Sequence, residues 1–325
     1  MARVPGYRAA LAGDTKYPPQ DGQPALKQAI QRKFRRDSGL DFALNEITVG
    51  NGGKGVIFNA LMATVDEGDE VVIPAPYWGA YPLMTRVVGG EPVVVNCPQN
   101  NGFKLRPEDL DAAITPRTKW LILNSPNNPT GAMMARESIE RVVNEATGVV
   151  FIDEAYAEFA GVSAVDLAER SDRVLVIRTM SKAFGLAGLR IGYAIGQPKL
   201  VMEVEKSRGP YKLNAMAEQM AIAALRHDRD WIDEHVALAI QLRERLADAL
   251  RAMGLSPMPS SANFVCVPVA NCVAVGQALR ARGVAVRPFP TLPHVGDALR
   301  ISVGPWSMLQ RLLDALAPAI AEVNG

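Results

Sequence analysis

Lys182 is the residue of this sequence best placed to act as a nucleophilic amine. It follows residues 174–179, an apolar and β-branched run that is typical of a buried strand in a parallel sheet. Ligands of open α/β sheets bind where such strands end. A lysine is normally a solvated surface charge, so the residues at the neighbouring strand ends decide which interpretation holds.

Two segments nearer the N-terminus could hold the phosphate and the ring of a flat cofactor. Gly53 and Lys54 stand between a strand and a helix, where glycine permits close approach and unpaired helix N–H groups attract an anion. Trp78 lies in a proline-stiffened loop and could stack on a heterocycle. A plain turn at Gly53 and core packing of Trp78 are equally compatible with the sequence.

Three polar residues follow later strands. Asn128, in the turn-rich segment 124–131, could donate to an aromatic oxygen, and Tyr156 could reach the same oxygen. Asp153 ends the apolar run 149–152, where an ionised carboxylate is costly without a cationic partner. A pyridinium nitrogen supplies this partner, and the carboxylate keeps the ring protonated so that it can withdraw electrons from a carbanion.

These groups together describe one ligand, pyridoxal 5′-phosphate (PLP). A desolvated lysine amine with a lowered pKa condenses with an aldehyde to give a Schiff base, and we assign this role to Lys182. Thr179, Ser181 and Arg190 would add phosphate contacts, because hydroxyl and guanidinium groups donate well to phosphate. The candidate catalytic residues are Lys182, Asp153 and Tyr156.

Strand-like and helix-like segments alternate through the first two thirds of the chain. Helical periodicity marks residues 22–36 and 54–65. The alternation predicts an α/β fold with a mostly parallel central sheet and helices on both faces. The expected strands of this sheet are residues 46–49, 70–73, 92–96, 119–124, 149–153, 174–179 and 190–195.

The last third of the sequence predicts a smaller C-terminal α+β domain. A long helix at 231–253 leads into it and a terminal helix at 306–323 closes it. We therefore expect a large PLP-binding domain at 1–225, with a short N-terminal segment 1–16, and a small domain at 226–325. The expected strands of the small domain are residues 263–267, 284–287 and 299–303.

Composition restricts the classes of partner. Hydrophobic residues make up 48% of the 325 residues, and 35 Lys+Arg nearly balance 34 Asp+Glu, so no basic footprint for nucleic acid is present. The three cysteines match neither a disulfide framework nor a zinc pattern, so we expect a reducing cytoplasm and no metal. No apolar run is long enough to span a membrane.

Three motifs carry a family resemblance. Asn-Ser-Pro-Asn-Asn-Pro-Thr-Gly at 124–131, Asp-Glu-Ala-Tyr at 153–156 and Ser-Lys at 181–182 with Arg190 occur in this order. The chain thereby resembles PLP-dependent aminotransferases of class I/II, which have the fold-type I architecture, over nearly its whole length. The resemblance implies a Schiff base at Lys182, Asp153 at the ring nitrogen, Trp78 on the ring, and these further contacts: Asn128 and Tyr156 at the ring oxygen, and Gly53, Lys54, Thr179 and Arg190 near the phosphate.

The resemblance also implies a reaction and a partner. An aminotransferase moves an amino group between an L-amino acid and a 2-keto acid, and Arg300 would bind the substrate α-carboxylate. Tyr17 looks like the family tyrosine that reaches the phosphate of the neighbouring subunit, which implies a homodimer.

The two halves of the chain are similar to different subfamilies. Up to about residue 130 the chain is similar to bacterial aspartate aminotransferases, in which Lys54 would meet a distal substrate carboxylate. From residue 154 onward it is similar to histidinol-phosphate and aromatic aminotransferases, in which Arg287 would bind a substrate phosphate. Both side chains could equally be solvated surface charges, so acidic, aromatic and phosphorylated substrates all stay open.

Alternatives to transamination follow from the start of the chain. Only sixteen residues precede Tyr17, fewer than is usual in the family. A more open active site is therefore expected. A decarboxylation, elimination or cyclisation with the same cofactor is the alternative to transamination. A non-catalytic PLP-binding module is a third alternative. Nucleotide binding is not predicted, because no dinucleotide glycine fingerprint follows the first strand.

Overall fold

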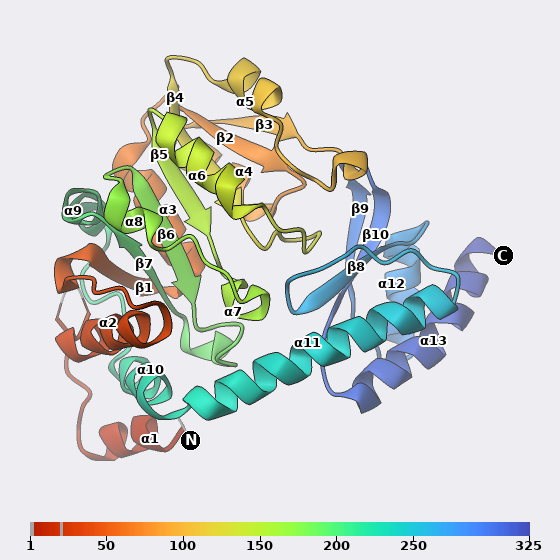
Figure 1. The fold of residues 1–325 in the computed structure, drawn as a ribbon. Coiled ribbons are helices and arrows are strands. Elements are labelled where there is room, and N and C mark those ends of the chain that lie inside the picture. The colour runs from red at the N-terminus through yellow and green to blue at the C-terminus, as the bar shows by residue number, and fades with distance from the viewer. Residues whose placement is uncertain (1–2, 20–21) are drawn as a thin grey trace.

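A seven-stranded sheet forms the centre of the computed structural model, which describes residues 3–19 and 22–325 (Figure 1). The strand order is β1-β7-β6-β5-β4-β2-β3. Only β7 runs antiparallel to its neighbours within the described residues, so the predicted mostly parallel sheet is confirmed. The strands are β1 (Ile47–Asn51), β2 (Glu70–Ala75), β3 (Glu91–Asn96), β4 (Thr118–Asn124), β5 (Val149–Asp153), β6 (Val174–Thr179) and β7 (Ile191–Gly196).

Helices cover both faces of this sheet, as predicted. One face packs against α3 (Gly52–Thr64), α4 (Ala80–Val87) and α9 (Pro198–Ser207), which contribute Ile57, Tyr81 and Val204 to one core. The opposite face packs against a second group that contributes Phe34, Val143 and Ala221 to another core. The second group comprises α2 (Pro24–Ser38), α6 (Arg136–Glu145), α7 (Ala157–Ala160), α8 (Leu167–Arg170) and α10 (Ala215–His227).

The remaining short elements lie at the margins of the sheet. Helix α1 (Arg3–Leu11) packs against α10, and α5 (Pro107–Ala113) follows β3. Three single-turn 3₁₀ helices connect longer elements: η1 (Leu44–Glu46), η2 (Gln99–Asn101) and η3 (Ala187–Leu189).

A second, smaller sheet follows the long helix α11 (Arg229–Ala252), which in Figure 1 extends from α10, next to the large sheet, to α13, next to the small one. Its strands are antiparallel in the order β8-β10-β9, and α12 (Cys272–Ala281) and α13 (Trp306–Asn324) pack on it. The α+β architecture of this part is therefore confirmed, while the domain boundary after residue 225 stays a prediction. The strands are β8 (Phe264–Pro268), β9 (Arg287–Leu292) and β10 (Gly296–Ser302).

The strand expected at 284–287 is misplaced. Strand β9 begins at Arg287 and continues through Pro288 and Pro290 to Leu292. Proline removes a backbone donor and argues against a central strand, but β9 is an edge strand of its sheet, where proline is tolerated. In the described ranges of the chain, no helix is long and apolar enough to cross a membrane.

Candidate active site

The carboxyl ends of the central strands meet at one level and enclose a cavity of about 270 Å³. Register brings them together, because Asn124 of β4 pairs with Asp153 of β5, and Asp153 pairs with Ile177 of β6. Parallel strands place their ligand sites at this edge. The predicted residues that line the cavity are Gly53, Lys54, Trp78, Asn128, Asp153, Tyr156, Thr179, Ser181, Lys182 and Arg190.

The Asp153 carboxyl group is buried and fixed by two donors. Tyr81 donates its hydroxyl to Oδ2 at 2.6 Å, and the backbone N–H of Ala155 donates to Oδ1 at 2.9 Å. Burial raises the pKa of Asp153, while both hydrogen bonds and the nearby Lys182 amine oppose the rise. A cationic group bound in the cavity would therefore stabilise the ionised form of the Asp153 carboxyl group.

Tyr81 was missed in the sequence, although it follows Trp78 by three residues in an aromatic-rich stretch. Its side chain is buried, and burial raises its pKa well above the usual value, with the adjacent Asp153 carboxylate adding to the rise. The hydroxyl therefore keeps its proton and stays a donor to Asp153.

The Lys182 amine has the environment of a nucleophile. It lies 5.3 Å from the centroid of the Tyr156 ring, and it is partly buried. Desolvation lowers its pKa, and the positive charges of Arg300 and Arg190 lower it further, while Asp153 opposes them. An amine with a lowered pKa is unprotonated more often and can attack a carbonyl carbon.

Tyr156 is held in place beside this amine. Its ring packs edge-on against Phe264, with ring centroids 5.2 Å apart. Burial raises the pKa of its hydroxyl to about 12. At neutral pH the hydroxyl is therefore protonated and can donate a hydrogen bond into the cavity.

A glycine-lined anion cradle lies where β1 turns into α3. Gly52 has a positive φ of 74°, and a side chain there would place its Cβ 2.2 Å from an Nη atom of Arg190. Helix α3 begins at this point without a side-chain cap, so its first N–H groups are free to bind an anion. Thr179 and Ser181 lie beside this cradle, with their hydroxyl oxygens 3.0 Å apart. The cradle fits the phosphate of PLP.

Trp78 and Lys54 form one wall of the cavity. The Trp78 ring packs edge-on against Tyr81, with centroids 5.4 Å apart, and the Lys54 amine lies 5.0 Å from the Trp78 ring centroid. Trp78 lines the cavity and also packs against the hydrophobic core on this face of the sheet, and Gly53 lines the cavity as well.

Arg300 connects the second sheet to the cavity without lining it. Its Nη1 donates to Oδ1 of Asn128 at 2.6 Å, and its guanidinium lies 5.0 Å from the Phe264 ring and 5.7 Å from the Phe289 ring. Its buried Nε has no hydrogen-bond partner among the residues that the structure describes. Arg300 therefore retains a donor for a further acceptor, such as a substrate carboxylate.

Tyr17 and Arg287 do not line the cavity of the single chain. Tyr17 is 79% exposed and stacks on Tyr211, with ring centroids 4.1 Å apart. Arg287 is exposed and pairs with Arg300 across strands β9 and β10. The expected roles of both residues stay predictions.

Comparison with known proteins identifies the family. The family described as aminotransferase class I and II matches residues 7–316. The chain belongs to this family. A probable aspartate/prephenate aminotransferase of Rhizobium leguminosarum bv. phaseoli is 38% identical over 78% of this chain and 67% of its own length.

Solved structures agree with this assignment. The aspartate aminotransferase of Rhizobium meliloti has a TM-score of 0.86 and 30% identity, covering 98% of this chain and 87% of that one. An aromatic aminotransferase from Pyrococcus horikoshii also has a TM-score of 0.86, with 25% identity over 99% of this chain and 92% of that one. The predicted family, fold type, PLP cofactor and aminotransferase class are confirmed.

Proposed function

We propose that this aminotransferase uses Lys182 as the amine that attaches to the cofactor aldehyde and later moves the substrate proton, with an acidic L-amino acid as donor. The observation that carries this proposal is the shared cavity, in which the Lys182 amine, the buried Asp153 carboxyl and the Gly52–Arg190 cradle converge. When bound, PLP supplies an electrophilic carbon and an electron-withdrawing ring.

Each residue of the cavity then has a defined task. Asp153, oriented by Tyr81, would hold the ring nitrogen in its protonated form. Asn128 and Tyr156 would hold the ring oxygen, and Trp78 would cover the ring. The Lys182 amine would act as the base that takes up the substrate Cα proton and gives it back.

Arg300 would orient the substrate for this proton transfer. Its Nη1 donates to Asn128, which lines the cavity, and its buried Nε has no hydrogen-bond partner among the described residues. A guanidinium binds a carboxylate through two parallel hydrogen bonds and so fixes its plane. A carboxylate held in this way would present the substrate Cα proton to the Lys182 amine.

An acidic donor is supported by the cations around this position. Arg287 lies directly opposite Arg300 in the strand register, and like charges in this arrangement repel unless an anion lies between them. Lys54 offers a further positive charge at the cavity wall. The relatives named aspartate/prephenate aminotransferase are consistent with a second carboxylate on the substrate.

The proposal includes a homodimer in the cytoplasm. The exposed Tyr17 would reach the phosphate of the partner subunit, and its stacking on Tyr211 would hold it in an extended position. The three cysteines are free and buried, which supports a reducing compartment.

A panel of amino donors tests the proposed reaction. The PLP-loaded protein is mixed with aspartate, glutamate, phenylalanine or histidinol phosphate, and loss of the visible cofactor band is followed in a single half-reaction. Aspartate or glutamate should react fastest, and regeneration of the band should require a 2-keto acid. Product formed in excess of one equivalent per protein without an added keto acid would instead indicate decarboxylation or elimination.

A further inference from the structure

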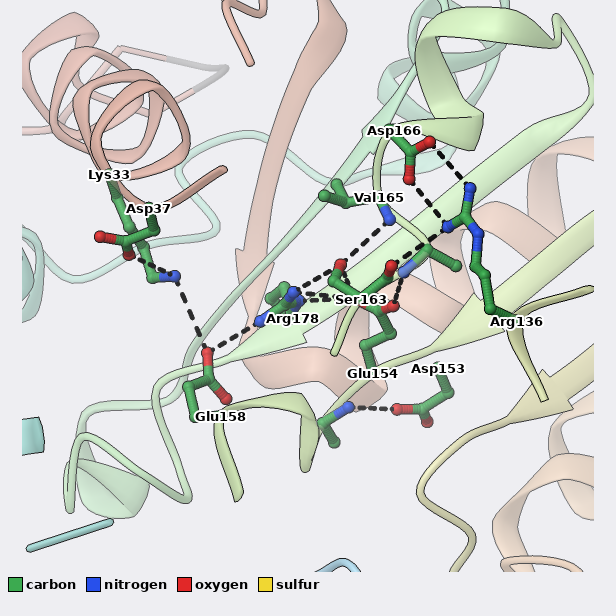
Figure 2. A network of polar contacts seen from close by, with 12 residues as sticks. Lys33, Asp37, Arg136, Asp153, Glu154, Glu158, Ser163, Val165, Asp166 and Arg178 are labelled. Carbon is green, nitrogen blue, oxygen red and sulfur yellow. Dashed lines mark hydrogen bonds and ion pairs between the residues drawn. The ribbon is translucent and has the colours of Figure 1, made fainter. Parts of the chain in front are cut away.

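A cluster of buried charges lies behind the cavity, on the opposite face of strands β5 and β6. Side chains alternate along a strand, so Asp153 and Thr179 face the cavity while Glu154 and Arg178 point the other way. Figure 2 shows the Glu154 and Arg178 side chains and the polar contacts around them. Glu154 and Arg178 are both buried, with 3% and 6% of their side chains exposed.

All three nitrogens of the Arg178 guanidinium donate hydrogen bonds within this cluster. Nε donates to Oε2 of Glu154 at 2.9 Å, Nη1 donates to Oε1 of Glu158 at 3.0 Å, and Nη2 donates to Oγ of Ser163 at 2.9 Å. The three partners come from the end of β5, from α7 and from the loop after α7. The Arg178 side chain of β6 therefore binds three consecutive segments of the chain.

The acceptors of Arg178 are themselves fixed. Glu154 accepts a second hydrogen bond from Oγ of Ser163 at 2.8 Å and another from the N–H of Ala164. Glu158 lies 3.9 Å from the Lys33 amine of α2. Figure 2 shows the resulting chain from Lys33 through Glu158 and Arg178 to Glu154. The cluster is therefore linked to helix α2 through the ion pair of Glu158 with Lys33.

The cluster is adjacent in sequence to both reacting groups. Asp153 immediately precedes Glu154, and Thr179 immediately follows Arg178. Thr179 accepts a hydrogen bond from the N–H of Ser181 at 3.1 Å, and Lys182 is the next residue. A rotation of either strand end would thus change the distance between the Lys182 amine and the Asp153 carboxyl group.

We propose that Arg178 is a positioning residue that fixes the Lys182 amine relative to Asp153 by locking the ends of β5 and β6 together. This inference rests on the proposed roles of Lys182 and Asp153. Stability alone does not require an ion pair here, since well-packed apolar side chains often stabilise a core equally well. The planar guanidinium differs because its hydrogen bonds have fixed directions, and directional bonds set an orientation that apolar contacts leave loose.

Four variants of the full-length, PLP-loaded protein test this role. Arg178→Met removes the directional bonds, Arg178→Lys keeps the charge, and Glu154→Gln keeps the volume and an acceptor. Arg136→Gln is the matched control, because Arg136 donates to the Ser163 carbonyl and to Asp166 in the same region without contacting Glu154 or Glu158. The measured quantities are visible circular dichroism per unit of cofactor absorbance, the kcat and KM for the donor, and the melting temperature.

The expected result separates positioning from stability. Arg178→Met should bind cofactor, yet lose at least half of its visible dichroism per bound cofactor and at least tenfold in kcat, with KM changed less than threefold. Arg178→Lys should recover part of both signals, and Arg136→Gln should match the wild type. If Arg178→Met does not fold, Glu154→Gln should show a smaller loss of the same two signals.

Two results would overturn the inference. One is wild-type dichroism and kcat in a folded Arg178→Met or, failing that, in Glu154→Gln, and the other is an equal loss in Arg136→Gln. A wild-type protein that forms no visible band with PLP would instead contradict the proposed function, so the two failures are distinguishable.

Discussion

The hydroxyl of Tyr81 donates to Oδ2 of Asp153 across 2.6 Å in the buried wall of the cavity. We predict that Tyr81→Phe weakens PLP binding by about tenfold or more, because a hydrogen bond to a charged group contributes about 1.5–3 kcal/mol and its loss raises the pKa of Asp153 further. Titration of the apoprotein with PLP, followed by the visible band, measures the dissociation constant. Tyr77→Phe, which removes a hydroxyl from the adjacent loop, is the control, and equal affinities in the two variants would refute the role of Tyr81.

The anion cradle gives a second prediction through a pair of glycines. Gly52 and Gly68 both have positive φ, at 74° and 86°, so alanine at either position costs about 1–2 kcal/mol of backbone strain. Only at Gly52 would the new Cβ collide with Arg190, since no atom lies within 4 Å at Gly68. Gly52→Ala should therefore lose affinity for PLP about tenfold or more, but keep affinity for phosphate-free pyridoxal. Equal losses for PLP in Gly68→Ala would show that strain, and not the cradle, is responsible.

Lys182 makes the stability of the apoprotein depend on pH. Because burial lowers its pKa in the folded state below the usual 10.5, the unfolded chain binds its proton more tightly. The associated stability is present above pH 10.5 and is lost as the pH falls through the folded pKa. We predict that the Lys182→Met apoprotein is about 1 kcal/mol more stable than the wild type at pH 7, and that this gain shrinks toward pH 10.5.

Denaturant unfolding of the apoproteins at several pH values measures this difference. Lys199→Met, at an exposed lysine, serves as the control and should show no pH-dependent gain. A gain of Lys182→Met that stays constant between pH 7 and pH 10.5 would contradict the lowered pKa.

The second carboxylate of an acidic donor gives a prediction for Lys54. Since Lys54 lines the cavity over the Trp78 ring, whereas the exposed Arg287 does not line it, we predict that Lys54→Met lowers kcat/KM for aspartate about tenfold or more relative to alanine, in keeping with about 1.5–3 kcal/mol for a charged hydrogen bond. Arg287→Met should have a smaller effect on this ratio. A larger effect of Arg287→Met, or no change in either variant, would contradict the assignment of the distal carboxylate to Lys54.

Residues at strand ends could be predicted from the sequence because two local patterns coincide there. An apolar run followed at once by a polar residue marks Asp153, Lys182 follows the end of β6 by three residues, and the parallel sheet then brings both to one edge. The same reasoning found the glycine cradle, because strand, glycines and helix are consecutive in the chain.

Contacts between distant segments could not be predicted in this way. Tyr81 lies 72 residues from Asp153 and reaches it only because α4 packs on this face of the sheet, against β2 and β3. Arg178 belongs to the same strand as its apolar neighbours, and nothing in the adjacent sequence indicates that its side chain contacts Glu154 and Glu158. Strand β9 was misplaced because its two prolines argue against a strand, although an edge strand tolerates them.

The central claim is that the Lys182 side chain, and no other amine, attaches to PLP. The direct measurement is peptide mapping by mass spectrometry after PLP is added and the complex is reduced with borohydride. The account predicts one modified peptide with the pyridoxyl group on Lys182, and no such adduct in Lys182→Met. An adduct on Lys54 or another lysine, or no adduct at any position, would contradict it.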